Sequence, residues 1–168
     1  MSYVKNLSDS LGLLLFRKKA IKSIARDEKA TLYAVYTVLI SSVASLFGIL
    51  TWWIALFVPF IFLFKTILMH VIALLLGGKA TIEDFFRPMG ATHVAYWITA
   101  FPIIGAVLRP IIFLYLLPVE VAIIKHTHKL SIERSIIVVL LPFILLMIKL
   151  VLVFIYFLSL IIELVPFL

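Results

Sequence analysis

The chain has 168 residues, of which 65% are hydrophobic and only 14% are charged, and its mean hydropathy is +1.26. A soluble domain carries roughly 25% charged residues, so this composition excludes a water-soluble fold and predicts an integral membrane protein. The absence of cysteine excludes disulfides and thiolate metal sites. The formal net charge is +7, and the basic residues flank apolar segments. This placement favours retention beside an anionic membrane leaflet over nucleic-acid binding.

Residues 1–29 form a basic segment that precedes the first apolar run. Two stripes at helical spacing run along this segment, one basic and one apolar. The basic stripe comprises Lys18, Lys22, Arg26 and Lys29, and the apolar stripe comprises Leu13, Phe16, Ala20 and Ile24. The pattern predicts an amphipathic helix that lies in the membrane interface. A basic flank that only sets membrane orientation is the alternative interpretation.

Five apolar segments follow and form one domain, residues 30–168. They predict an all-α fold, a polytopic bundle of five transmembrane helices, because about 20 helical residues cross a hydrocarbon core of about 30 Å. The expected spans are residues 31–50, 54–76, 88–104, 111–124 and 135–160. Pro88 suits the first turn of the third span, and residues 101–110 are expected to form a tight turn. Pro142 kinks the last span, or the end of that span lies along the interface.

Lysine and arginine are distributed unevenly between the two sides that five spans define. Seven lie in residues 1–29, two in the loop after the second span and three in the loop after the fourth, all on the side of the N-terminus. The opposite side holds only Arg109. The positive-inside rule therefore predicts a cytoplasmic N-terminus, an external C-terminus and a location in the cell membrane.

Three motifs resemble the Yip family of membrane proteins, which is named for interaction with Ypt/Rab GTPases. In the stretch from Gly77 to Gly90, a glycine pair ends a helix and a short basic segment follows. The second motif is His128-Lys129-Leu130-Ser131, which precedes the last helix, and the third is residues 14–24 before the first helix. A proline is common in the family where Arg17 stands. The resemblance covers nearly the whole chain, and only about 29 residues precede the first helix, as in the compact prokaryotic members.

The resemblance implies a non-enzymatic role in membrane organisation or trafficking, as an adaptor or scaffold. Expected partners are the bilayer, anionic lipid headgroups at the cytoplasmic face, a cytoplasmic protein and further copies of the chain, but no nucleic acid and no cofactor. The two cytoplasmic loops are expected to form the recognition surface, with solvated or partner-facing side chains. These are Lys79, Glu83, Asp84, Arg87, His126, His128, Lys129 and Arg134.

Ionisable residues inside the expected spans cost about 2.5–3.5 kcal/mol each at the centre of a helix. They are Lys65, His70, His93, Glu120 and Lys149. At about 1.5 Å per residue, His70, His93 and Glu120 all lie about 8–10 Å from the cytoplasmic edge. They are thus candidates to converge into a polar or metal-binding cluster.

Three other interpretations of these ionisable residues stand beside that one. The histidines are neutral and bond neighbouring helices, Glu120 pairs with Lys65 across two helices, or the side chains snorkel to the interface. A small channel or transporter for ions, protons or metals is accordingly the alternative function, and an intramembrane metalloenzyme is the third. Because no nucleophile or phosphate-loop motif is present, no catalytic residue is predicted.

Overall fold

The computed structural model describes residues 3–46 and 57–164. Within these ranges all regular structure is helical, which confirms the predicted all-α class. In chain order the helices are α1 (Tyr3–Leu14), α2 (Lys18–Arg26), α3 (Ala30–Leu46), α5 (Val58–Leu75), α6 (Ile82–Ala91), the 3₁₀ helix η1 (Thr92–Ala100), α7 (Pro102–Thr127) and α8 (Ile132–Leu164). The end of the first expected span and the start of the second lie outside the described residues.

Three described helices are long and apolar enough to cross a membrane. They contain the segments Val58–Leu75 in α5, Gly105–Thr127 in α7 and Ile132–Phe157 in α8. Their outward faces are apolar, as helices that contact lipid require; Phe60 and Phe64 of α5, for example, are each 70% exposed. These helices indicate a membrane-embedded protein. The apolar part of α3 is shorter, Ala30–Ala44.

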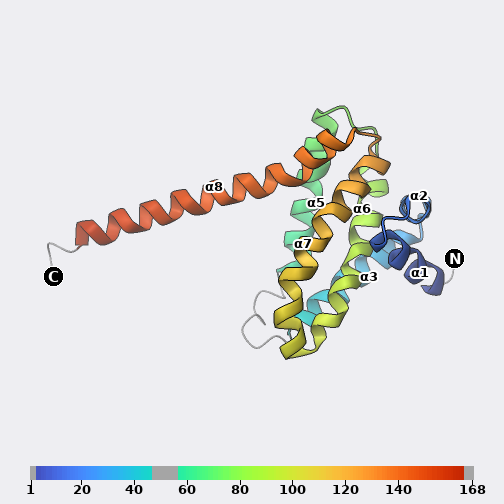
Figure 1. Cartoon of the computed structure of the whole chain (residues 1–168), viewed down its shortest axis with the longest axis horizontal. Coiled ribbons are helices and arrows are strands. Elements are labelled where there is room, and N and C mark those ends of the chain that lie inside the picture. The colour runs from blue at the N-terminus through green and yellow to red at the C-terminus, as the bar shows by residue number, and fades with distance from the viewer. Residues whose placement is uncertain (1–2, 47–56, 165–168) are drawn as a thin grey trace.

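The helices pack unevenly, and the C-terminal part of α8 projects away from the rest (Figure 1). α3 packs against α6 and η1, η1 packs against α7, and α5 contacts α3, α6 and α8. α8 buries Ser135, Val138 and Val139 and then projects away, with every described side chain of residues 143–159 exposed. α8 is one helix from Ile132 through Pro142 to Leu164. The described residues thus form an all-helical chain with three candidate membrane-spanning helices.

The N-terminal segment forms two helices rather than one. Phe16 has φ of 58° in the turn between α1 and α2, where an L-residue seldom lies. Both helices pack against the rest of the chain: α1 contacts η1, and α2 contacts α6 and α7. Phe16 is exposed, whereas Ile21 and Ile24 are buried. The apolar face of α2 is thus covered by protein.

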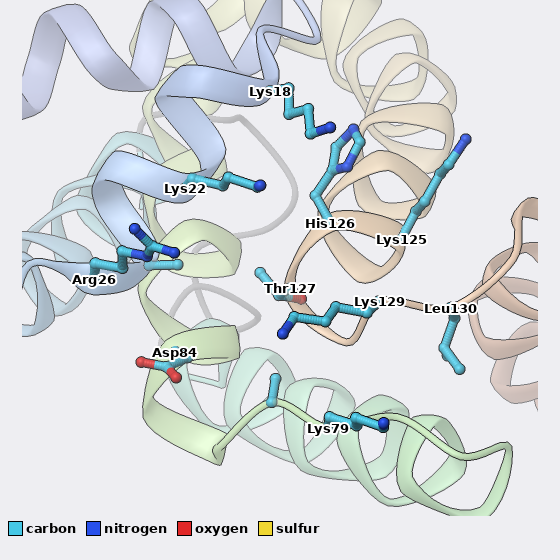
Figure 2. A pocket seen from close by; sticks show the side chains of 12 residues that line it. Lys18, Lys22, Arg26, Lys79, Asp84, Lys125, His126, Thr127, Lys129 and Leu130 are labelled. Carbon is cyan, nitrogen blue, oxygen red and sulfur yellow. The ribbon is translucent and has the colours of Figure 1, made fainter.

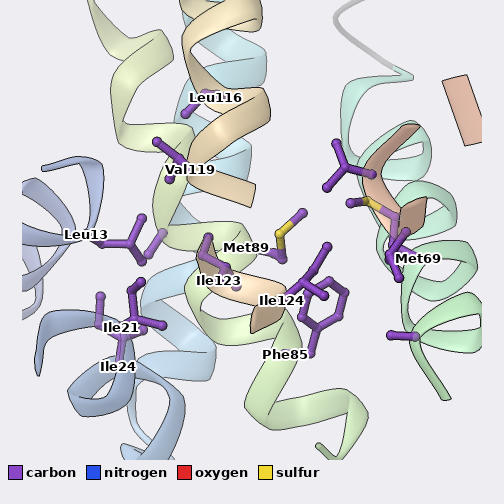
Figure 3. Packing of buried hydrophobic residues seen from close by; sticks show 14 of the residues in the cluster. Leu13, Ile21, Ile24, Met69, Phe85, Met89, Leu116, Val119, Ile123 and Ile124 are labelled. Atoms are coloured by element: carbon purple, nitrogen blue, oxygen red, sulfur yellow. The ribbon is translucent and has the colours of Figure 1, made fainter. Parts of the chain in front are cut away.

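The hydrophobic core joins these two N-terminal helices to α6 and α7. Figure 3 shows Leu13, Ile21 and Ile24 directed toward the side chains of α7, with Ile123 and Phe85 in the same cluster. All five are at most 1% exposed. Burying each such side chain stabilises the fold by about 1.5–3 kcal/mol relative to exposure in water. This packing holds α2 in a fixed position over the ends of α6 and α7.

The third expected span, which should have begun at Pro88, is wrong in its bounds. α6 begins at Ile82, because Thr81 Oγ1 accepts a hydrogen bond from the backbone N–H of Asp84 at 3.2 Å and so caps the helix. Pro88 lies inside α6, and the backbone continues after Ala91 as η1. A nine-residue 3₁₀ helix is unusual, since such runs seldom exceed 3–4 residues.

The fourth expected span, residues 111–124, is too short, and the expected turn over residues 101–110 is wrong. α7 has 26 residues and begins at Pro102. Proline fits there, because the first helical residues have no intrahelical partner for their N–H groups. The fixed φ of proline is also close to the helical value. Pro110 and Pro118 lie inside α7. The reversal between η1 and α7 is confined to the neighbourhood of Phe101.

Candidate functional site: a basic basin beside a buried ion pair

Basic side chains from three separate segments surround one hollow of about 530 Å³, which we call the basic basin. Its six cations are Lys18, Lys22, Arg26, Lys79, Lys125 and Lys129, and the other lining residues are Ala25, Ala80, Asp84, His126, Thr127 and Leu130. Figure 2 shows Lys22 of α2 and Lys129 beyond α7 extending into the hollow from opposite walls. The three basic regions of the sequence therefore meet in one surface.

The helical period of α2 and the burial of its apolar side provide one wall of the basin. Lys18, Lys22 and Arg26 are each four residues apart, so they share one helix face. Ile21 and Ile24 anchor the buried side of α2. The basic face consequently points toward the end of α7.

The glycine pair after α5 sets the position of the Lys79 loop. Gly77 has φ of 91° and donates its N–H to Leu74 O at 2.9 Å, while Gly78 donates to Ala73 O at 2.8 Å. These two bonds form a Schellman motif, which ends the helix and turns the chain sharply. The N–H of Lys79 then bonds His128 O at 3.2 Å. This bond ties the loop after α5 to the end of α7.

Charge in the basic basin is strongly unbalanced. None of its six cations has an ion pair within 4.0 Å in the described part of the chain. The single lining carboxylate, Asp84, instead accepts a hydrogen bond from Arg87 Nη1 at 3.3 Å. Cations held this close repel one another unless an anion or solvent screens them. The basin is therefore a surface of strong positive charge.

Arg87 corrects our expectation of a solvated or partner-facing residue, because it is only 5% exposed. Its Nη1 donates to Ala25 O at 2.8 Å, and its Nε donates to Thr31 Oγ1 at 2.8 Å. Exposed Glu83 also accepts from Arg87 Nη2, at 3.4 Å. Arg87 thus links the end of α2 and the start of α3 to α6. These bonds help to fix α2, which forms one wall of the basic basin.

His128 is likewise buried, not solvated as expected, with 0% of its surface exposed. Its Nε2 lies 3.4 Å from Nδ1 of His70, and its ring contacts Phe85 edge to face with centroids 5.1 Å apart. Burial, with a smaller contribution from His70, lowers the pKa of His128 to about 4. His128 is therefore neutral at physiological pH and serves packing between the two loops.

Glu120 of α7 is paired with Lys65 of α5, one of the interpretations left open by the sequence. Both residues line a second hollow of about 570 Å³ together with His93 and Tyr96. Glu120 is buried, and its Oε2 has no hydrogen-bond partner among the residues that the structure describes. The pair joins two helices at the wall of this hollow.

His93 makes a separate contact with α3. Its Nδ1 lies 3.0 Å from Ser41 Oγ, and that hydroxyl donates its only proton to Val38 O at 2.7 Å. This contact joins η1 to α3. A neutral histidine that bonds a neighbouring helix was one of the alternatives.

His70, His93 and Glu120 do not meet as a group of three. His93 and Glu120 line the same hollow, whereas His70 lies beside His128. Among the described residues, no cluster of three or more histidine, cysteine or acidic side chains could hold a metal ion. Lys149 is exposed on the projecting part of α8.

Two further residues of the expected recognition loops, Arg134 and His126, have different roles in the structure. Arg134 donates from Nη1 to Leu76 O at 3.0 Å and so caps the end of α5. His126 belongs to α7 and lines the basic basin. Ser41, Ser42 and Ser45 were all possible partners of His93, and nothing in the sequence placed any one of them near it. Lys18, Lys22 and Arg26 were expected to share one helix face, but the sequence did not predict that this face meets Lys79, Lys125 and Lys129.

Comparisons of the chain with protein-family models, with curated proteins and with solved structures give no match.

Proposed function

We propose that the chain is a non-enzymatic integral membrane protein of the Yip-like class, which acts as a scaffold that organises anionic lipid at the cytoplasmic membrane face. The observation that carries this proposal is the basic basin, where three segments far apart in the sequence place six cations around one hollow. Each basic side chain near an anionic membrane surface contributes about 1 kcal/mol of attraction. A fixed arrangement of six basic side chains would concentrate anionic lipid beside the protein.

The proposed topology has five passes, of which α3 and the α6–η1 segment supply the two that lack a long apolar helix. α6 has 10 residues and η1 has 9. At about 1.5 Å per residue in α6 and about 2.0 Å in η1, together they reach about 33 Å. This length is close to the hydrocarbon thickness of about 30 Å. The arrangement supports a crossing, with the 3₁₀ winding supplying the extra reach.

The ends of the long helices support a location of the basic basin at the membrane edge. α5 ends at Leu75 and α7 at Thr127, and α8 begins at Ile132. Lys79, Lys125 and Lys129 lie at or just beyond these ends. Positively charged loops are retained on the cytoplasmic side. The basin would therefore face the headgroups of the cytoplasmic leaflet.

Lipid analysis of the protein in copolymer-extracted native nanodiscs tests the proposal. We expect anionic phospholipid around the parent protein to exceed its fraction in the bulk membrane by about twofold or more. The double variant Lys22→Gln/Lys129→Gln should remove most of this enrichment. The matched control Lys19→Gln/Lys29→Gln removes two charges outside the basin and should retain it. Bulk lipid composition around the parent protein, or equal losses in both variants, would refute the scaffold role.

A small transporter is the second candidate, and the Lys65–Glu120 ion pair at the wall of the 570 Å³ hollow is the observation that favours it. Ionisable groups within a membrane commonly mark ion or proton pathways. Proteoliposomes loaded with a pH-sensitive dye test this function. Proton flux that disappears in Glu120→Gln supports transport, and equal leakage with and without protein excludes proton transport.

A further inference from the structure

The basic basin has more positive charge than a singly charged headgroup would neutralise. It presents six cations and one carboxylate, and that carboxylate is held by Arg87. A phosphodiester headgroup carries one negative charge. A phosphomonoester carries about 1.5–2 near neutral pH, together with three acceptor oxygens. The second kind of headgroup therefore matches both the charge and the number of donors around the hollow more closely.

The walls of the basin can hold such a group from several directions. α2 presents Lys22 from one side, and Lys129 reaches in from the segment after α7 on the other (Figure 2). α2 is fixed by its buried face and by the hydrogen bond from Arg87 to Ala25 O at 2.8 Å. Cations fixed in advance lose little entropy when they bind an anion, which raises affinity.

We propose that the basic basin binds a membrane lipid whose headgroup is a phosphomonoester, in preference to phosphodiester lipids. This inference rests on the proposed function, because it names the lipid class that the scaffold selects. The basin adjoins the ends of α5 and α7, so a headgroup can enter it while the acyl chains stay beside these helices. Charge-assisted bonds from several lysines to one dianion give the selectivity.

Binding of short-chain lipids to the full-length protein in a neutral detergent tests the proposal. Dioctanoyl phosphatidic acid, dioctanoyl phosphatidylglycerol and dioctanoyl phosphatidylcholine are titrated by calorimetry at pH 7.5. We expect phosphatidic acid to bind about tenfold more tightly than phosphatidylglycerol, because its charge is nearly doubled. At pH 5 the phosphomonoester loses most of its second charge, since its second pKa is about 6, and the ratio should fall to about twofold.

Two variants locate the site. Lys22→Gln/Lys129→Gln should weaken phosphatidic acid binding about tenfold, and Lys19→Gln/Lys29→Gln, which removes equal charge outside the basin, should change it less than about twofold. Circular dichroism melts of both variants should match the parent. Equal losses in the two variants would overturn the assignment to the basin.

The remaining outcomes separate this inference from the proposed function. Equal binding of phosphatidic acid and phosphatidylglycerol, both above phosphatidylcholine, overturns the phosphomonoester preference and leaves the anionic-lipid scaffold standing. No preference for either anionic lipid overturns both. Glycerol 3-phosphate, which has the headgroup without acyl chains, should bind at least tenfold more weakly than phosphatidic acid. Equal binding of this soluble ester would overturn the assignment to a lipid.

Discussion

At the scale of single residues, the two glycines that end α5 are required for different reasons. Gly77 needs its positive φ of 91°, whereas at Gly78 the difficulty is space. A Cβ on Gly78 would lie 2.5 Å from His128 Nδ1 and 2.7 Å from Ala73 O. The carbonyl is backbone and cannot move aside cheaply. The contact between the Lys79 loop and the end of α7 therefore requires a residue without a Cβ at position 78.

We predict that Gly78→Ala lowers the free energy of unfolding by about 3 kcal/mol, near the upper end for overpacking. Gly77→Ala, which meets only the flexible end of Arg134 at 3.7 Å, should cost about 1 kcal/mol for its left-handed backbone. Unfolding by a denaturing detergent measures both variants. A smaller loss for Gly78→Ala than for Gly77→Ala would contradict the steric account.

Buried His128 predicts a loss of stability in acid. Its pKa is lowered from 6.5 to about 4 in the folded chain, mainly by burial. Between these values the unfolded chain binds a proton that the folded chain excludes. Stability is thus full above pH 6.5 and falls as the pH drops toward 4, by on the order of 2 kcal/mol.

Melting temperatures recorded from pH 7.5 to pH 4.5 measure this effect. His128→Gln should reduce the slope against pH. His70→Gln removes only the smaller cause of the shift and should leave most of the slope in place. An unchanged slope in His128→Gln would show that another group controls the acid response.

Burial of Arg87 and His128 was not predictable from their local sequence. Both occur in polar stretches, where lysines and acidic residues are indeed exposed. Their burial depends on groups distant in the chain: Ala25 O and Thr31 Oγ1 for Arg87, and His70 for His128. A single sequence gives the polarity of a segment but not which of its members acquires partners.

At the scale of helices, the Lys65–Glu120 pair links α5 to α7 and predicts strong coupling. Breaking a buried pair leaves one charge without compensation, at a cost of about 3–5 kcal/mol, whereas replacing both members is often neutral. Because the Lys65 side chain is 35% exposed, we expect about 3 kcal/mol for either Lys65→Met or Glu120→Leu. The double variant should cost less than about 1 kcal/mol.

A double-mutant cycle in the same detergent-unfolding assay checks this coupling. The four proteins share one lipid and detergent composition, so solvent effects on the exposed part of Lys65 cancel. Losses that simply add, giving about 6 kcal/mol for the double variant, would mean that the two side chains do not stabilise each other.

The helix bounds were predictable where local chemistry decides them. Thr81 followed three residues later by Asp84 is a signal for a helix N-cap. α6 does begin at Ile82, directly after Thr81. Pro88, which suits the first turn of a helix, instead predicts a later start for the third span. The 3₁₀ winding of η1 has no signal in the local sequence, and η1 begins just after a close approach of α6 to α3. A Cβ on Gly90 would lie 2.6 Å from Ala34 Cβ, and Thr37 Oγ1 donates to Gly90 O at 2.8 Å.

At the scale of the whole molecule, charge distribution was the more reliable guide. Counting lysines and arginines by side grouped three regions that the fold brings into one basin. Apolar length was a weaker guide, since it predicted five spans of unequal length. Only three described helices have spanning length and composition, and α8 departs from the others after its first turns. Length gives the number of apolar segments, but their packing depends on side-chain fit between helices.

The central claim is that the three basic segments lie together on the cytoplasmic side. Since the parent has no cysteine, single cysteines can be labelled in intact cells with a membrane-impermeant maleimide. Lys19→Cys, Thr81→Cys and Thr127→Cys represent the three segments, and Ala106→Cys marks the opposite end of α7. We predict labelling of Ala106→Cys alone before permeabilisation and of all four afterwards. Labelling of any of the first three in intact cells would contradict the claim.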